Sequence, residues 1–220
     1  MYRTKTGTMI LAAILVLVVA SGALAAKQVI ITATKKLNYQ GQKGDAMVEG
    51  NVKIEYGTTF IYAEKLLFNS DTKIAKIDTG VRIVQDDIVI TANVMTADFK
   101  TEKMTVTGNV KLELTEELAE KDAAGKPLKD VIVLLTQRME IDINTNDFTA
   151  TGGVTITKDK QKAQAAEARY IDAESKMTLT KGVVITTVDG DTVKSDSAII
   201  YTDKETFEAE GEKIEINFTV

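Results

Sequence analysis

The chain has 220 residues, 44% of them apolar, which is enough for the core of one sandwich- or barrel-sized domain or of two small ones. It contains no cysteine and no histidine, which excludes disulfides, Cys/His zinc sites, thiol nucleophiles and every catalytic triad that needs an imidazole. The 27 basic and 32 acidic side chains give a net charge of −5 and form no basic stripe. We therefore expect no nucleic-acid partner.

The first 26 residues have the order of a secretory signal peptide. Arg3 and Lys5 precede an apolar run from Ile10 to Ala20, and small residues follow up to Ala26. The Ala23-Leu-Ala25 pattern predicts cleavage after Ala25 or one residue later, which leaves a net charge of −7. The alternative is an uncleaved N-terminal membrane anchor, because the apolar stretch approaches the ~20 residues that a bilayer requires. In both cases residues 27–220 are expected to form one exported domain.

A unit of about 29 residues recurs through the rest of the chain, and such self-similarity is the most informative signal in the sequence. The best copies are Val48–Tyr56 (VEGNVKIEY) and Val106–Leu114 (VTGNVKLEL), and weaker ones begin at residues 79, 152, 181 and 211. The aligned valines lie 29, 29, 44 and 29 residues apart; they are Val52, Val81, Val110, Val154 and Val183. Each copy reads as a Gly-Asn-like turn followed by an alternating strand.

A second element precedes each of these turns. Tyr62–Asn69 recurs as Thr91–Asp98, Ala165–Asp172 and Lys194–Tyr201. The unit is therefore a strand that ends in Asn or Asp, a polar turn, a strand that runs into Gly, another turn, and an alternating strand. Val, Ile, Thr, Tyr and Phe dominate these segments, and turn residues return every 8 to 12 positions, which predicts an all-β protein.

One interval contains about 15 extra residues, Thr115–Asp130 (TEELAEKDAAGKPLKD). Helix-forming residues up to Ala124 would allow one or two helical turns, which Gly125 and Pro127 would end. We expect an insertion in a hairpin, at a position where loops tolerate extra residues.

Two architectures suit tandem β units: a twisted, partly open antiparallel jelly-roll and a parallel β-solenoid. We favour the antiparallel form, because turns such as Asn69–Thr72 join consecutive short strands directly. Alternation such as Val52/Ile54 against Lys53/Glu55 gives each strand one apolar and one charged face.

Carboxylates are the remaining candidates for catalysis. The pairs Asp86-Asp87, Glu116-Glu117 and Asp189/Asp191 fall in predicted turns or in the insertion, where solvated acids are the simpler interpretation. The segment Asp142–Asp147 (DINTND) offers oxygen ligands but lacks the glycine and the final glutamate of a calcium loop. We therefore expect no enzyme activity, no metal and no cofactor.

The alternating apolar residues form the candidate interior face: Val52, Ile54, Val81, Ile83, Val110, Leu112, Val154, Ile156, Val183 and Ile185. They would fill the core of an ordinary sandwich. However, the facing strands bring small residues such as Ala63, Ala92 and Ala168, and aromatic residues make up only 5% of the chain. A long sheet lined in this way could enclose a groove for an aliphatic guest.

The repeated combination of an Ala-Glu opening and a Gly-Asn-Val-x-Ile strand resembles the organic-solvent-tolerance or lipopolysaccharide-transport bridge family. The resemblance spans about Val29 to Phe218 and is strongest at Val48–Tyr56, Tyr62–Asn69 and Val106–Leu114. It implies a periplasmic jelly-roll whose interior carries the acyl chains of lipopolysaccharide or another acylated lipid. It also implies contacts with inner- and outer-membrane components of a lipid-transport machine. A membrane-anchored relative in the same pathway would keep the N-terminal segment.

Self-association is expected at the two ends of an open sheet, because unpaired backbone groups there can template another chain. The candidate edge strands are residues 28–32 and 213–220, with the apolar positions Val29, Ile31, Ile214, Ile216 and Phe218. Joining two different edges is heterologous and gives an open head-to-tail filament. The competing hypothesis is a structural or adhesive tandem-β surface protein with a packed core and no lipid.

Overall fold

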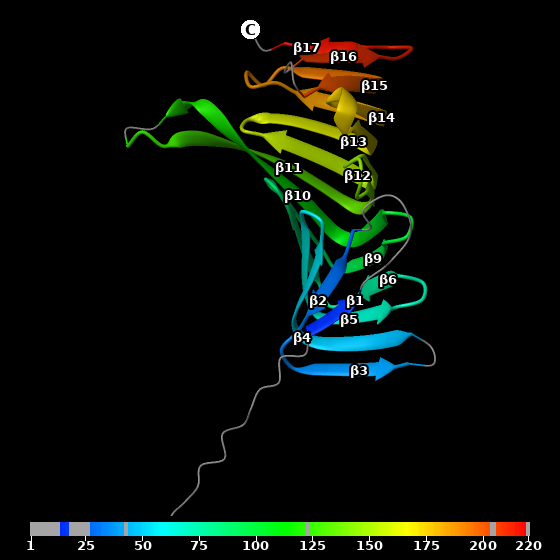
Figure 1. Ribbon diagram of the computed structural model, residues 1–220. Coiled ribbons are helices and arrows are strands. Elements are labelled where there is room, and N and C mark those ends of the chain that lie inside the picture. The colour runs from blue at the N-terminus through cyan, green and yellow to red at the C-terminus, as the bar shows by residue number, and fades with distance from the viewer. Residues whose placement is uncertain (1–13, 18–26, 42–43, 122–123, 203–205, 219–220) are drawn as a thin grey trace, which may run out of the picture.

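The strands form a single antiparallel sheet. The computed structural model describes residues 14–17, 27–41, 44–121, 124–202 and 206–218, and Figure 1 shows their strands stacked row upon row along a curved sheet. Every pairing between strands is antiparallel. The sheet does not close on itself. The predicted fold is therefore confirmed, and the parallel solenoid is excluded.

Seventeen strands and one short 3-10 helix make up the described chain. The strands of the N-terminal part are β1 (Ile14–Leu17), β2 (Val29–Thr32), β3 (Lys36–Gln40), β4 (Asp45–Tyr56), β5 (Thr59–Asn69), β6 (Ile74–Ile77), β7 (Val81–Gln85), β8 (Ile88–Ala92) and β9 (Val94–Asp98). The remaining elements are β10 (Lys103–Lys121), β11 (Pro127–Asp142), β12 (Phe148–Lys158), β13 (Gln161–Ile171), η1 (Asp172–Glu174), β14 (Lys176–Thr186), β15 (Thr192–Tyr201), β16 (Thr206–Glu210) and β17 (Glu215–Asn217).

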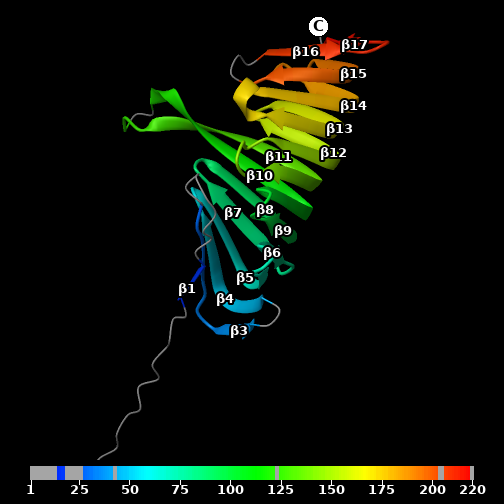
Figure 2. The same ribbon diagram turned by 45° about the vertical axis from the view of Figure 1, so that its right-hand side comes forward.

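Each long strand crosses a corner that divides the sheet into two facing walls. Short strands occur in pairs that share one long neighbour: β6 and β7 both pair with β5, and β8 and β9 both pair with β10. We call the strand halves in line with β6 and β9 wall 1, and those in line with β7 and β8 wall 2. Figure 2 shows the rows from a second side. The corner closes one side of the molecule, and the free ends of the two walls face each other across a mouth.

The corner is built from irregularities that recur in row after row. The register shifts between Glu49 and Val52 in β4 and between Thr107 and Val110 in β10. Corresponding shifts occur in β11, β12, β13 and β14. The two Gly-Asn pairs, predicted as turns between strands, instead lie inside continuous strands. Gly108 (φ +78°) and Asn109 (φ +50°) adopt the left-handed conformations of a β-bulge, which bends a strand without ending it.

The apolar sides of both walls meet in one core. Its most completely buried large side chains come from almost every row: Ile54, Ile61, Leu66, Ile77, Met95, Leu134, Met139 and Leu179. Alternation places Lys53, Glu55, Lys111 and Glu113 on the outer face, where each is half-buried. The predicted alternation of strand faces therefore agrees with the structure.

The segment 115–130 is a hairpin extension and contains no helix among its described residues. Strands β10 and β11 continue past the sheet and pair with each other as far as Lys121 and Pro127, and the ribbon projects away from the molecule in Figures 1 and 2. The helical turns that the residues would allow are therefore not formed in the described part of the segment, which is an insertion in a hairpin. Cross-strand pairing along the extended ribbon outweighed the helix propensity of the individual residues.

The ends of the sheet contain more strands than predicted. β2 and β3 both pair with β4 at the N-terminal end, and β16 and β17 both pair with β15 at the C-terminal end. On its other side β2 pairs with β1, which belongs to the predicted signal or anchor segment. Apart from residues 14–17, that segment lies outside the described residues. Among the described residues, no α-helix is long and apolar enough to cross a membrane.

Candidate ligand-binding cavity

The two walls enclose a cavity of about 390 Å³ in the middle of the sheet. Its lining comes from both walls and mainly from β7, β8 and the rows β10 to β14. The apolar lining residues are Ile83, Ile88, Ile90, Met104, Leu112, Leu114, Ile132, Leu134, Ile141, Ile143, Phe148, Ile156, Tyr170 and Met177. Such a mostly apolar, partly open cavity has the properties of a ligand site.

Strand register explains why the wall 2 side of the cavity is continuously apolar. Leu112 of β10 stands opposite Ile90 of β8 on one side and Leu134 of β11 on the other. Leu134 in turn stands opposite Ile156 of β12. Because alternate residues of a strand share a face, each row adds a second aliphatic residue two positions further on, as Leu114 does after Leu112. The result is an aliphatic surface across at least four adjacent strands.

Polar side chains lie at the rim of this cavity. They are Thr59, Gln85, Asn146, Asp172, Ser175 and Thr202. On the wall 1 side, hydrogen bonds connect the β13–β14 loop to the residue that follows β15. The Thr202 backbone N–H and hydroxyl donate to the Ser175 carbonyl, at 2.9 and 3.0 Å. The Ser175 N–H donates to the Asp172 carbonyl at 2.9 Å. The rim is thus a fixed set of hydroxyl, amide and carboxylate groups above an apolar interior.

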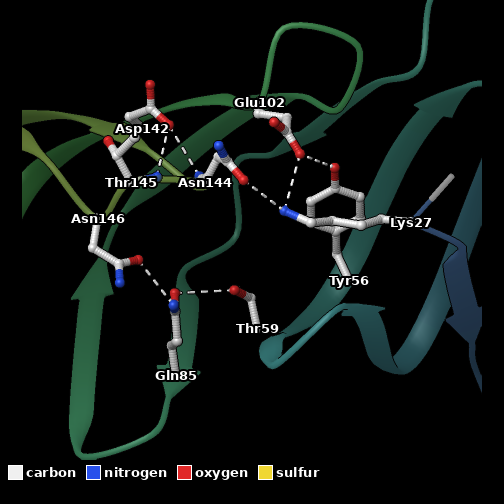
Figure 3. Close-up of polar contacts among 9 residues, drawn as sticks. All are labelled: Lys27, Tyr56, Thr59, Gln85, Glu102, Asp142, Asn144, Thr145 and Asn146. Carbon is white, nitrogen blue, oxygen red and sulfur yellow. Dashed lines mark hydrogen bonds and ion pairs between the residues drawn. The ribbon is translucent and has the colours of Figure 1, made fainter. Parts of the chain in front are cut away.

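A group of polar contacts, which we call the mouth clasp, joins the free ends of the two walls on the N-terminal side of the cavity (Figure 3). Glu102, from the β9–β10 loop of wall 1, accepts hydrogen bonds from the Tyr56 hydroxyl at 2.7 Å and from the Lys27 ammonium at 3.1 Å. Lys27 also donates to Asn144 Oδ1 at 3.1 Å. Tyr56 and Lys27 lie at the free end of wall 2. The contacts therefore connect the walls across the mouth.

Gln85 continues the clasp at the cavity itself. Its side-chain nitrogen donates to Asn146 Oδ1 at 2.9 Å, and its side-chain oxygen accepts from the Thr59 hydroxyl at 3.0 Å. Figure 3 shows Gln85 between these two partners. Beneath the clasp the ring of Tyr56 packs on that of Phe99, with centroids 5.1 Å apart. Both rings are buried, so the mouth is covered and filled on this side.

The clasp also shifts the ionisation of its members. The hydrogen bond from Tyr56, followed by that from Lys27, lowers the pKa of Glu102. Burial and then the bond to Glu102 raise the pKa of Tyr56. Glu102 is thus charged and Tyr56 protonated over the whole neutral range. The clasp joins a carboxylate, an ammonium group and a phenol by hydrogen bonds, which suits a structural contact rather than acid–base catalysis.

Three of the ten predicted interior residues line the cavity, namely Ile83, Leu112 and Ile156. The others lie in the packed core near the corner; they are Val52, Ile54, Val81, Val110, Val154, Val183 and Ile185. Sequence reasoning missed Ile132, Leu134 and Ile141 of β11, because no Gly-Asn motif marks that strand. The sequence signal for this strand was the two-residue spacing of Ile132 and Leu134 and of Met139 and Ile141, which places each pair on one strand face.

The predicted edge residues differ in their surroundings. Val29 and Ile31 of β2 are buried in the core. Ile214, Ile216 and Phe218, at the other end of the sheet, are exposed. Leu37 and Tyr39 of β3 and Phe207 of β16 are further exposed apolar side chains at the two ends, and the sequence analysis did not select them.

The acidic candidates lie in loops or in the projecting ribbon. Asp86 and Asp87 form the β7–β8 turn, and Asp189 and Asp191 lie in the β14–β15 loop. Glu116 and Glu117 pair with β11 in the hairpin extension. The Asp142 carboxylate is occupied by Lys103 and by two backbone N–H groups of its own loop. The bond from Lys103 is the main cause that lowers the pKa of Asp142.

Comparisons with known proteins find a family similarity for part of the chain. Residues 25–115, somewhat less than half of the sequence, match the family described as "Lipopolysaccharide-assembly, LptC-related". No curated protein matches the chain. One solved structure that matches is LptH from Pseudomonas aeruginosa, described as the LptA-homologous periplasmic component of a lipopolysaccharide transport device. It is 12% identical with a TM-score of 0.28, over 88% of this chain and 96% of that one. The family match over residues 25–115 confirms the resemblance to lipopolysaccharide-transport proteins that the repeated motifs predicted.

Proposed function

We propose that the protein is a periplasmic component of a lipopolysaccharide-transport bridge and that it shields acyl chains between its two walls. The observation that carries this proposal is the apolar cavity with a polar rim, together with the family match of residues 25–115. Sugar and phosphate groups of a lipid would remain at the mouth, while its hydrocarbon replaces water in the interior.

Hydrophobic transfer supplies enough free energy for this role. Each buried methylene contributes about 0.8 kcal/mol, so roughly ten methylenes contribute on the order of 8 kcal/mol before the costs of binding. The same term makes free diffusion of such a lipid through water negligible. A protein that offers an apolar surface between membranes therefore removes the main barrier to transfer, and the energy for directed movement must come from a partner.

A matched pair of variants tests lipid binding. Leu134 lines the cavity and is buried, whereas its neighbour Leu135 is 46% exposed on the outer face of the same strand. Protein purified without detergent should release acylated lipid on solvent extraction, as measured by mass spectrometry. We expect Leu134→Trp to reduce the lipid recovered per protein and Leu135→Trp to leave it unchanged. Lipid-free protein from a host that makes lipopolysaccharide would contradict the proposal and favour a structural scaffold.

We further propose that copies join head to tail through the two ends of the sheet. Both ends are rows of two short strands, β2 with β3 and β16 with β17, each paired on one side with a long strand. The directions of these strands allow β16 of one copy to run antiparallel to β3 of the next. Lys36 on β3 and Glu208 and Glu210 on β16 carry opposite charges, which favours this orientation over like-end pairing.

The N-terminal segment bears on both location and assembly. Strand β1 occupies the outer side of β2, so removal of residues 1–26 would free that half of the N-terminal end for a neighbour. We propose that the exported protein is cleaved after Ala25 or Ala26 and acts as a soluble bridge unit. Recovery of the intact chain only in the inner membrane would instead support the membrane-anchored component of the same pathway.

A further inference from the structure

The polar side chains at the cavity rim indicate which kind of lipid headgroup can bind at the mouth. Ser175 and Asn146 both line the cavity. Among the described residues, neither the Ser175 hydroxyl nor the Asn146 side-chain nitrogen has a hydrogen-bond partner, although Asn146 Oδ1 accepts from Gln85. Hydroxyl and amide groups of this kind pair well with the hydroxyls and amides of a sugar.

The charged group at the same rim is a carboxylate. Asp172 lines the cavity mouth, and its backbone N–H donates to the carboxylate of Asp147 at 3.0 Å. Within the described part of the chain neither of these two acids forms an ion pair. The described lining includes no lysine or arginine. A phosphate or carboxylate at this position would meet the negative charge of Asp172, and none of the described lining residues is a cation that could offset it.

The size of the cavity limits how much hydrocarbon it holds. A methylene group occupies about as much space as a water molecule in the liquid, roughly 30 Å³. A volume of about 390 Å³ therefore accommodates on the order of a dozen methylenes. This volume matches one acyl chain of medium length.

On the basis of the proposed function, we infer that the cavity binds one acyl chain at a time, carried on an uncharged sugar-like headgroup. It discriminates against the same chain attached to an anionic headgroup. In a phosphorylated glycolipid the sugar hydroxyls and amides would face Asn146, Ser175 and Thr202, and the phosphates would point away into solvent. The acyl chains of one lipid would then pass through the cavity one after another.

Two alkyl probes of equal length test this inference on the full chain. Dodecyl maltoside and dodecyl phosphate, both kept below their micellar concentrations, are titrated into the protein at low ionic strength, and calorimetry gives affinity and stoichiometry. We expect one maltoside per protein, bound about three- to tenfold more tightly than the phosphate, as expected for one or two carboxylates acting through a partly aqueous mouth. Raising the salt concentration should narrow the difference.

Charge variants locate the discrimination at the rim. Asp172→Asn should narrow the ratio between the two probes by improving phosphate binding. Asp78→Asn makes the same change in net charge at an exposed position near the corner and should leave the ratio unchanged. Circular dichroism establishes that both variants keep the native β-structure.

The probe titrations distinguish a failure of this inference from a failure of the proposed function. Equal or tighter binding of dodecyl phosphate, a ratio that Asp172→Asn does not alter, or two maltosides per protein would overturn this inference and leave the proposed function standing. No binding of either probe would contradict the proposed function itself.

Discussion

Replacing Tyr56 with phenylalanine tests the mouth clasp most cleanly, because it removes one hydroxyl and keeps the buried ring. The ring packing on Phe99 persists, but the 2.7 Å hydrogen bond to Glu102 is lost. A hydrogen bond to a charged group contributes about 1.5–3 kcal/mol. The Glu102 side chain is 30% exposed and keeps its ion pair with Lys27. Water and Lys27 therefore offset part of the lost hydrogen-bond energy. We expect a destabilisation of about 1–2 kcal/mol, or roughly 3–6 °C in Tm for a chain of this size.

The pH dependence gives this prediction a second readout. The pKa of Glu102 is lowered in the folded protein, so the stability that it provides is fully present above the ordinary glutamate pKa of about 4.3. That stability is lost as the pH falls through the lower folded value. The pKa of Tyr56 is raised, so the hydroxyl remains a donor at neutral and mildly alkaline pH. The difference between wild type and variant should be constant from about pH 5 to 9 and should shrink in acid.

Thermal unfolding followed by circular dichroism measures both effects. Tyr39→Phe is the matched control, because Tyr39 is 51% exposed on β3 and its hydroxyl has no partner among the described residues. The control should unfold like the wild type at every pH. An unchanged Tm for Tyr56→Phe at pH 7, or a difference that persists undiminished at pH 3, would refute the reasoning.

Three further predictions concern the corner, the ends of the sheet and export. Gly108→Ala should lower the free energy of unfolding by about 1–3 kcal/mol, because φ is +78° and the added Cβ would press on Asn93 in the next row. Gly125 has the same φ but open space around it, so Gly125→Ala should lower the free energy of unfolding less. Chemical denaturation measures both values. Ile216→Pro should abolish concentration-dependent oligomers in sedimentation experiments, and Ala124→Pro, in the tip of the projecting hairpin, should not. N-terminal sequencing of periplasmic protein should begin immediately after Ala25 or one residue later, and an intact first residue would reject cleavage.

The strands and their faces were predictable because burial imposes a period of two that the sequence displays directly. Val52 and Ile54 alternate with Lys53 and Glu55, and a slip of one residue would expose the whole apolar set. The Gly-Asn pairs were located correctly but misinterpreted, since the same left-handed conformations serve hairpin turns and bulges. Only the pairing of neighbouring rows distinguishes the two.

The cavity was less predictable than the fold, because it depends on where the two walls separate rather than on any one strand. Leu134 and Ile132 look like ordinary core residues in the sequence, and β11 has no glycine at its corner. The extension of β10 and β11 was missed for a related reason. Its residues favour helix individually, while the pairing that makes them a ribbon is a property of two segments together.

Site-specific photo-crosslinking at positions 112 and 111 tests the central claim that acyl chains bind between the walls. Leu112 lines the cavity, while the adjacent Lys111 points to the outer face and is half-buried. With a photoreactive amino acid at one position at a time, cells that make lipopolysaccharide are irradiated and the protein is probed for attached lipid. We predict a lipid adduct at position 112 and none at position 111. An adduct at 111 without one at 112 would contradict the proposed interior.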